Sequence, residues 1–230
     1  MKTAEIVVRI LEDEGITAAF GIPGAAINPV YQYLQSSTIK HYIARHEEGA
    51  VHAADGYCRA SGRMALAICT SGPGATNFVT GLYTARADSI PLIAITGQAS
   101  SKWLSIEAFQ CVDIAAIARP VSKATWCVTN PADVAGVMRE AFRTARSGRP
   151  GPVLVDLPLN EAVVGHGLDA PRSSYRSGVR AVATRYGIRY VSFQRSLRLP
   201  SNDYFDICHL LHPGAVTWQK RLSRVVVDLL

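Results

Sequence analysis

Two hydrophobic patterns alternate over the first 160 residues of the chain. One has the period of an amphipathic helix, and the other is a short apolar run typical of a buried strand. Residues 3–14 place apolar side chains on one helical face, and Gly15 follows where a helix would end. A short apolar run at 18–20 then enters a glycine-rich turn. This alternation is typical of βα units wound onto a parallel sheet.

The hydrophobic periodicity predicts the helices and strands of the first 160 residues. The expected helices are 27–35, 47–61, 74–86 and 131–146, besides 3–14, and the expected strands are 18–20, 39–43, 65–69, 90–95, 121–128 and 153–156. Residues 97–120 are expected to be rich in loops. The pattern therefore predicts an α/β fold in which a six-stranded parallel sheet carries helices on both faces.

After Pro158 the pattern loosens, and glycine, serine and proline become frequent. We expect a first domain over 1–162, a linker over 163–186 and a tail over 187–230. Within the tail, 187–193 suits a strand and 214–230 a helix. The net charge of +6 lies wholly in residues 166–230, because basic and acidic side chains are equal in number up to residue 165. The tail thus has the composition of a foreign segment.

Charge, cysteines and hydropathy limit the classes of partner. The arginines of the tail are dispersed and accompanied by few aromatic side chains, so we expect no nucleic-acid partner. The five cysteines form no CxxC pair, which favours buried free thiols over disulfides or a zinc site. The chain has no long apolar run, and its first residues enter a helical pattern directly. We expect a cytoplasmic location and no membrane partner.

A series of short motifs follows the expected strands. The turn Gly21-Ile22-Pro23-Gly24 alone indicates only a tight connection between a strand and a helix. It is followed, however, by further motifs at regular distances, and the combination is specific. They are Arg45-His46-Glu47-Glu48-Gly49-Ala50, Ala54-Asp55-Gly56-Tyr57, Thr70-Ser71-Gly72-Pro73-Gly74-Ala75-Thr76-Asn77 and Thr96-Gly97-Gln98.

In this order the motifs resemble the N-terminal, pyrimidine-binding domain of thiamine diphosphate (ThDP) enzymes over residues 1 to about 160. Phe109-Gln110-Cys111-Val112-Asp113-Ile114 and Ala118-Arg119-Pro120-Val121-Ser122-Lys123 are similar to segments of acetohydroxyacid (acetolactate) synthases and glyoxylate carboligases. Pro150–Pro158 looks like the strand that leaves this domain in the same group.

The resemblance implies a cofactor, ThDP, and a role for Glu47. In the family the matching carboxyl group hydrogen-bonds the pyrimidine ring, promoting the imino tautomer whose nitrogen removes the thiazolium C2 proton. Burial would favour the proton shuttling this requires, by disfavouring the charged carboxylate. Glu48 competes for the role, although the Arg-His-Glu register favours Glu47. A purely structural reading also exists, in which Glu47 stabilises a helix N-terminus through the macrodipole.

Further cofactor-binding residues follow from the same resemblance. The Thr70–Asn77 segment lacks the ending of a phosphate-binding loop, and by similarity it lines the aminopyrimidine pocket. Pro23, Gly24, Thr70 and Asn77 are therefore expected near the ring. Gln110 is expected to approach the cofactor, with a loop amide satisfied by backbone groups as the alternative. No residue is predicted to bind metal.

The implied reaction is that of a 2-oxoacid carboligase, with transferase or lyase chemistry. Pyruvate or glyoxylate would be decarboxylated and the carbanion joined to a second carbonyl. Gly24–Pro29, Ala87–Pro91 and Ile117–Pro120 resemble glyoxylate carboligase. Glu47 favours acetolactate synthase, because glyoxylate carboligases typically carry valine at that position.

Half of the family's active site is missing from the sequence. Diphosphate is held through Mg²⁺ by a second domain with a Gly-Asp-Gly motif, and no Gly-Asp-Gly occurs here. A central domain, which binds FAD in some members, is missing too. We therefore expect an oligomer with a diphosphate-binding domain or chain. The chain would be a truncated relative, a subunit of a split enzyme or a gene-model fusion, and a non-catalytic binding or assembly module is the alternative from another class.

Overall fold

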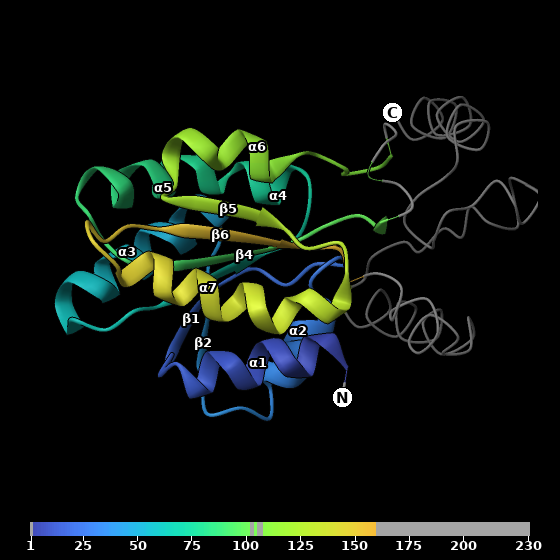
Figure 1. The fold of residues 1–230 in the computed structure, drawn as a ribbon, viewed down its shortest axis with the longest axis horizontal. Coiled ribbons are helices and arrows are strands. Elements are labelled where there is room, and N and C mark those ends of the chain that lie inside the picture. The colour runs from blue at the N-terminus through green and yellow to red at the C-terminus, as the bar shows by residue number, and fades with distance from the viewer. Residues whose placement is uncertain (1, 102–103, 105–107, 160–230) are drawn as a thin grey trace, which may run out of the picture. The chain divides into compact units, whose positions relative to one another are not determined.

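Figure 1 shows a computed structural model of the chain, in which residues 2–101, 104 and 108–159 are described. Within these residues, six parallel strands form one sheet with helices on both faces (Figure 1). The α/β fold expected from the sequence is therefore confirmed. The expected linker 163–186 and tail 187–230 lie outside the described residues, as do the strand and the helix expected within the tail.

The strands lie in the order β2-β1-β3-β4-β6-β5. They are β1 (Ala18–Gly21), β2 (Lys40–Ile43), β3 (Leu66–Cys69), β4 (Ile93–Gly97), β5 (Ala124–Cys127) and β6 (Val153–Leu157). The helices are α1 (Thr3–Asp13), α2 (Asn28–Leu34), α3 (Glu47–Ser61), α4 (Pro73–Thr76), α5 (Phe78–Ala87), α6 (Ile114–Ala118) and α7 (Val134–Arg146), with short 3₁₀ turns at Arg119–Val121 and Pro131–Asp133.

Several elements differ from the sequence-based expectation. The strand expected at 121–128 is shorter, Ala124–Cys127, and the helix expected at 131–146 begins with the 3₁₀ turn Pro131–Asp133 before α7. The strand expected at 90–95 occupies Ile93–Gly97, because Pro91 has no N–H to donate to a neighbouring strand. The helix expected at 74–86 is interrupted at Asn77, which ends α4 and precedes α5. A helix, α6, forms inside the stretch expected to be loop, where the side chain of Asp113 accepts a hydrogen bond from the N–H of Ala116 and caps the first turn.

The two faces of the sheet carry side chains of different size. Toward α1, α2 and α7, strands β3 and β4 present large side chains such as Leu66, Ile68 and Ile93. Toward α3, α5 and α6 the same strands present small ones such as Ala67 and Ala94. Successive strand residues point to opposite faces, so both layers are encoded in one short run of sequence. Both sets of side chains are fully buried.

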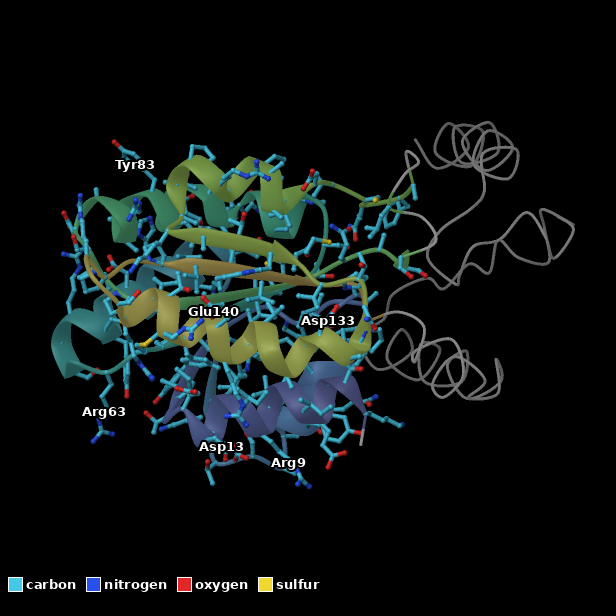
Figure 2. All side chains as sticks on the ribbon, in the orientation of Figure 1. Arg9, Asp13, Arg63, Tyr83, Asp133 and Glu140 are labelled. Carbon is cyan, nitrogen blue, oxygen red and sulfur yellow. The ribbon has the colours of Figure 1, made fainter. Side chains whose placement is uncertain are left out.

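Each outer helix layer has a polar side facing solvent. On α1, the charged side chains of Arg9 and Asp13 point away from the sheet (Figure 2). Tyr83 likewise projects outward from α5 and is 63% exposed (Figure 2). Among the described helices we find none with the length and hydropathy needed to span a bilayer.

Helices α3 and α5 approach each other closely on the small-residue face of the sheet. A Cβ added at Gly81 of α5 would lie 2.5 Å from the Cβ of Val51 on α3, so only glycine fits at this crossing. Val51 is itself fully buried. The contact sets the position of α3, and with it the position of Glu47 at the first turn of that helix.

The strand order creates a switch point between β1 and β3. The chain leaves β1 toward α2, on one face of the sheet, whereas it leaves β3 toward α4 and α5, on the other. Two loops that diverge from adjacent parallel strands leave a crevice at the carboxyl ends of those strands, where ligands of open α/β sheets bind. The carboxyl edge at β1 and β3 is therefore the expected place for a ligand site.

Candidate functional site

The motifs predicted from sequence meet at the carboxyl edge of the sheet. Gly21–Gly24 lies at the end of β1, Thr70–Asn77 follows β3, and Glu47 opens α3 after β2. These three strands are adjacent in the sheet, because β1 pairs with both β2 and β3. The motifs are thus brought together by strand order, although long stretches of sequence separate them.

Glu47 lies against Asn77 at the centre of this edge. The side-chain amide of Asn77 donates a hydrogen bond from Nδ2 to Oε2 of Glu47, over 3.0 Å. Asn77 lies at the junction between α4 and α5. Helix α3 begins at Glu47 as predicted, and His46 caps it by accepting a hydrogen bond from the N–H of Glu48.

The second carboxylate oxygen of Glu47 faces Gly74 on α4. A Cβ added at Gly74 would lie 3.2 Å from Oε1 of Glu47 and 3.1 Å from Cγ2 of Thr70. Oε1 has no hydrogen-bond donor among the described residues. Glu47 is only half-buried in this chain, whereas the sequence led us to expect a buried group. The oxygen is therefore free to accept a hydrogen bond from a ligand.

Thr70 links the loops that follow β1 and β3. A Cβ at Gly24 would lie 2.6 Å from the Cβ of Thr70, so the β1 turn passes directly over this side chain. The hydroxyl of Thr70 also accepts a hydrogen bond from the N–H of Ala26, over 3.3 Å. Gly24 and Thr70 thus form one wall beside Glu47.

Gln110 reaches the same edge from the segment that follows β4. A Cβ at Gly72 would lie 2.7 Å from the Cβ of Gln110 and 2.9 Å from its Cα. Both residues have positive φ angles, +60° for Gly72 and +54° for Gln110. Gly72 adopts this conformation readily, but it is uncommon for a glutamine. Such strain in a non-glycine residue is found preferentially at functional sites.

Glu48, the competing glutamate, lies in a different environment. Its carboxylate is 43% exposed and lies 3.7 Å from Nε2 of His52, one turn along α3. A second imidazole, that of His46, is 4.0 Å away. Glu48 therefore lies at the surface between two imidazoles, whereas Glu47 lies beside Gly74.

Pro23 faces a neighbouring groove. It is exposed and, with Tyr31 and His41, lines a groove of about 620 Å³ beside α2 and β2. The hydroxyl of Tyr31 lies 3.1 Å from Nε2 of His41, and the two rings meet edge to face. Burial lowers the pKa of His41. Glu47 is not among the described residues that line this groove, whereas Gly24, the next residue after Pro23, lies against Thr70.

A buried polar cluster that the sequence did not mark as part of the site lies behind Gln110. The carboxylate of Asp156, at the end of β6, accepts hydrogen bonds from the hydroxyl of Thr96 (2.6 Å) and from Nε2 of Gln98 (2.8 Å). Burial raises the pKa of Asp156 to about 7, against the opposing effect of these hydrogen bonds. The Thr96-Gly97-Gln98 motif was visible in the sequence, but its spacing does not indicate that Thr96 and Gln98 bind Asp156.

The residues of this edge fit one face of a flat, nitrogen-rich ring. Gly74 has no side chain beside Oε1 of Glu47, so an aromatic ring can approach the backbone closely at this point. Oε1 of Glu47 supplies a hydrogen-bond acceptor there, and Gln110 lies against Gly72, which is close by in the loop after β3. The arrangement accepts an aminopyrimidine better than a phosphate, because the charged group at its centre is itself an anion.

Comparison with known proteins identifies the family. The model of the N-terminal TPP-binding domain of thiamine pyrophosphate enzymes matches residues 1–117. Glyoxylate carboligase of Escherichia coli O157:H7 is 52% identical over 165 residues, which are 71% of this chain and 28% of that protein. The acetolactate synthase large subunit of Corynebacterium glutamicum is 52% identical over 159 residues, which are 69% of this chain and 25% of that protein.

A third relative, the probable acetolactate synthase large subunit of Methanocaldococcus jannaschii, is 47% identical over 158 residues. The chain spans about a quarter of the length of these curated relatives. Identity is therefore high but confined to one domain. Since the family model covers half of the chain, and the fold and the motif positions agree with it, the chain belongs to the thiamine pyrophosphate enzymes and carries their N-terminal TPP-binding domain.

Proposed function

We propose that this chain provides the pyrimidine half-site of a ThDP-dependent 2-oxoacid carboligase, with Glu47 as the group that activates the cofactor. The observation that carries the proposal is the asymmetry of the Glu47 carboxylate. Asn77 holds Oε2, while Oε1 faces the space left by Gly74. A carboxyl group fixed at one oxygen and open at the other is suited to exchange a proton with a ring nitrogen.

Each nearby residue has a distinct part in this proposal. Asn77 orients Glu47, and Gly74 lets the ring come within hydrogen-bond distance of Oε1. Thr70 and Gly24 form the wall against which the ring lies, and Gln110 borders its far side. When bound, ThDP supplies the carbanion stabilisation, and the protein supplies orientation and proton exchange. Pro23 belongs to the proposed site only through its neighbour Gly24.

The remaining half of the active site would come from a diphosphate-binding domain that holds Mg²⁺, on another chain or segment. The sequence has no Gly-Asp-Gly motif to serve that purpose. We therefore propose an oligomer in which residues 1–162 form the pyrimidine domain, 163–186 a linker and 187–230 a tail. Nothing in the described residues supports FAD binding, so FAD is not part of the proposal.

The substrate is proposed to be pyruvate, giving acetolactate, with glyoxylate as the second candidate. A glyoxylate carboligase and an acetolactate synthase are equally similar to this chain, at 52% identity. Glu47 favours pyruvate by resemblance, whereas the three segments near Gly24, Ala87 and Ile117 favour glyoxylate. A non-catalytic module that caps a full-length relative is the alternative from another class.

A reducing, cytoplasmic location is proposed from the thiols. The four described cysteines are all free: Cys58, Cys69, Cys111 and Cys127. Free cysteines at this density are usual in reducing compartments. Burial raises the pKa of Cys58 to about 11, which keeps this thiol protonated and unreactive.

Two measurements test the proposed function. Calorimetry of the full chain with ThDP and Mg²⁺ should show binding that weakens in Glu47→Gln and is unchanged in Glu48→Gln, the matched surface control. Mixed with a chain that carries a Gly-Asp-Gly domain, the wild type should release carbon dioxide from pyruvate, and Glu47→Gln should lower the rate by about 100-fold or more.

Release from glyoxylate but not pyruvate would select the second substrate. ThDP binding without turnover in any mixture would favour the non-catalytic module. Equal effects of the Glu47 and Glu48 substitutions would refute the assignment of Glu47.

A further inference from the structure

A row of polar and thiol side chains ends the sheet on the face covered by α5 and α6. Four strands contribute one residue each, in register: Cys69 pairs with Thr96, Thr96 with Asp156, and Asp156 with Cys127. The row lies directly above the apolar layer that contains Ala94 and Leu154. The row therefore separates the apolar core from the carboxyl edge of the sheet, where the candidate site lies.

Asp156 is the charged member of this row. It is 1% exposed, and Thr96 and Gln98, which donate to its two oxygens, are 0% and 1% exposed. A buried carboxyl group is costly unless its oxygens are hydrogen-bonded, and here both are. The side chain of Gln98 is therefore held in one orientation by a group that has no access to solvent.

Gln98 also connects the sheet to the segment that carries Gln110. Its Nε2 donates a second hydrogen bond to the carbonyl of Val112, over 2.7 Å, and its Oε1 accepts one from the N–H of Ala99, over 2.8 Å. The backbone N–H of Gln98 donates to the carbonyl of Leu157, over 3.0 Å. The backbone of Gln98 is thereby bound to β6 through Leu157, and its side chain is bound to β6 through Asp156. The same side-chain amide binds the carbonyl of Val112.

Val112 lies two residues beyond Gln110, whose backbone has a positive φ and packs on Gly72. A strained backbone of this kind persists only where neighbouring contacts hold it. The hydrogen bond from Gln98 to the Val112 carbonyl is such a contact. The position of Gln110 thus depends on this hydrogen bond from Gln98.

We propose that Asp156 and Gln98 are positioning residues for Gln110. The buried carboxyl group orients the Gln98 amide, which holds the Val112 carbonyl and so keeps Gln110 against Gly72 at the border of the pyrimidine half-site. The inference rests on the proposed function of that site, since it gives Gln110 its place beside the cofactor. Neither Asp156 nor Gln98 needs to contact the cofactor.

Titration of Asp156 provides a readout that a purely structural role would not move. Burial raises its pKa to about 7, so the carboxyl group changes charge near neutrality. The titratable groups that interact with it are one carboxylate, at the start of α6, and three thiols, namely Asp113, Cys69, Cys111 and Cys127. Loss of the proton strengthens the hydrogen bond from Gln98, because bonds to a charged acceptor are about twice as strong. Gln110 is thus held more firmly above pH 7.

The test follows the backbone amide signals of Gln110 and Cys111 in the full chain by NMR, from pH 5.5 to 8.5. In the wild type both signals should shift with a midpoint near pH 7. Asp156→Asn keeps an acceptor for Gln98 but cannot titrate, so it should abolish the shift and leave the signals near their wild-type positions. Gln98→Ala should displace them at every pH.

Asp113→Asn is the matched control, because it removes an exposed carboxylate close by and retains a helix cap. The midpoint near pH 7 should survive in this variant. Persistence of the titration in Asp156→Asn, or unchanged Gln110 signals in Gln98→Ala, would overturn the proposal. If Gln98→Ala does not fold, the Asp156→Asn comparison still decides.

Binding of ThDP separates this inference from the proposed function. Gln98→Ala should weaken the affinity about tenfold, as expected for one lost hydrogen bond to a charged network, and Asp156→Asn should weaken it less. A wild type that binds no ThDP even with a diphosphate-binding chain added, with the Gln110 titration intact, would refute the half-site but leave the anchoring role of Gln98 standing. If Gln98→Ala changes neither ThDP affinity nor the Gln110 signals, Gln98 does not position Gln110. The proposed half-site would be unaffected by that result.

Discussion

The amide of Asn77 and the carboxylate of Glu47 lie 3.0 Å apart across the carboxyl edge of the sheet, although 30 residues separate them in the chain. Asn77 lies at the junction of α4 and α5, and Glu47 is the first residue of α3. One oxygen of the glutamate is thereby fixed, and the other remains open toward Gly74.

Replacing Asn77 by Ala should weaken ThDP binding about five- to tenfold, because Glu47 loses the donor that orients it. Asn77→Asp should weaken binding more than Asn77→Ala, since a second carboxylate beside Glu47 disfavours the charged form of both. Calorimetry at pH 7.5 measures both affinities. The reverse order of the two variants would contradict the orienting role of Asn77.

Gly74→Ala should reduce ThDP affinity without unfolding the chain. The added methyl would lie 3.2 Å from Oε1 of Glu47 and so occupy the approach to that oxygen. Gly49→Ala, in the first turn of α3, is the matched control, because a Cβ there meets nothing within 4 Å. The control should bind ThDP as the wild type does. Equal affinities in the two variants would argue against a ring lying beside Gly74.

Gly81→Ala should lower the free energy of unfolding by roughly 1–3 kcal/mol, as overpacking in a filled core does. The new Cβ would lie 2.5 Å from the Cβ of Val51 and push α3 away from α5. Gly136→Ala, on α7, has open space around it and should be neutral or stabilise by up to about 1 kcal/mol. Urea unfolding measures both.

The cause of the Gly81 effect can be tested by adding Val51→Ala, which removes the atoms that the new methyl meets. The double variant should be more stable than the sum of the two single effects predicts. Strict additivity would mean that the two side chains do not meet.

Stability should depend on pH through Asp156. Its folded pKa of about 7 lies above the ordinary value of 3.8, so between these values the folded chain binds more protons than the unfolded chain. The free energy of unfolding should therefore fall as pH rises from about 4 to about 7, by up to about 1.4 kcal/mol per pH unit, and level off above.

Urea unfolding of the wild type and Asp156→Asn at pH 5, 6, 7 and 8 isolates this contribution, because other groups titrate alike in both proteins. The stability difference between the two should shrink with rising pH and be constant above pH 7. A difference that does not vary with pH would show that Asp156 titrates in its ordinary range.

Much of this architecture is readable from local pattern. The hydrophobic periodicity predicted five of the described helices and all six strands to within a few residues. It can do so because apolar residues recur with a different period in a helix and in a strand. The family resemblance pointed to Glu47, Thr70, Asn77 and Gln110 as members of one site. Glycine and proline spacing also marked the turn at Gly21–Gly24.

Contacts between individual residues could not be predicted from the local sequence pattern. The link from Asp156 through Gln98 to Val112 depends on β4 and β6 lying side by side. Strand order is set by long-range packing, in which Gly81 lets α3 meet α5, and β6 enters the sheet between β4 and β5. Residues far apart in the chain become neighbours only when that packing forms, and the orientation of Glu47 is one of its results.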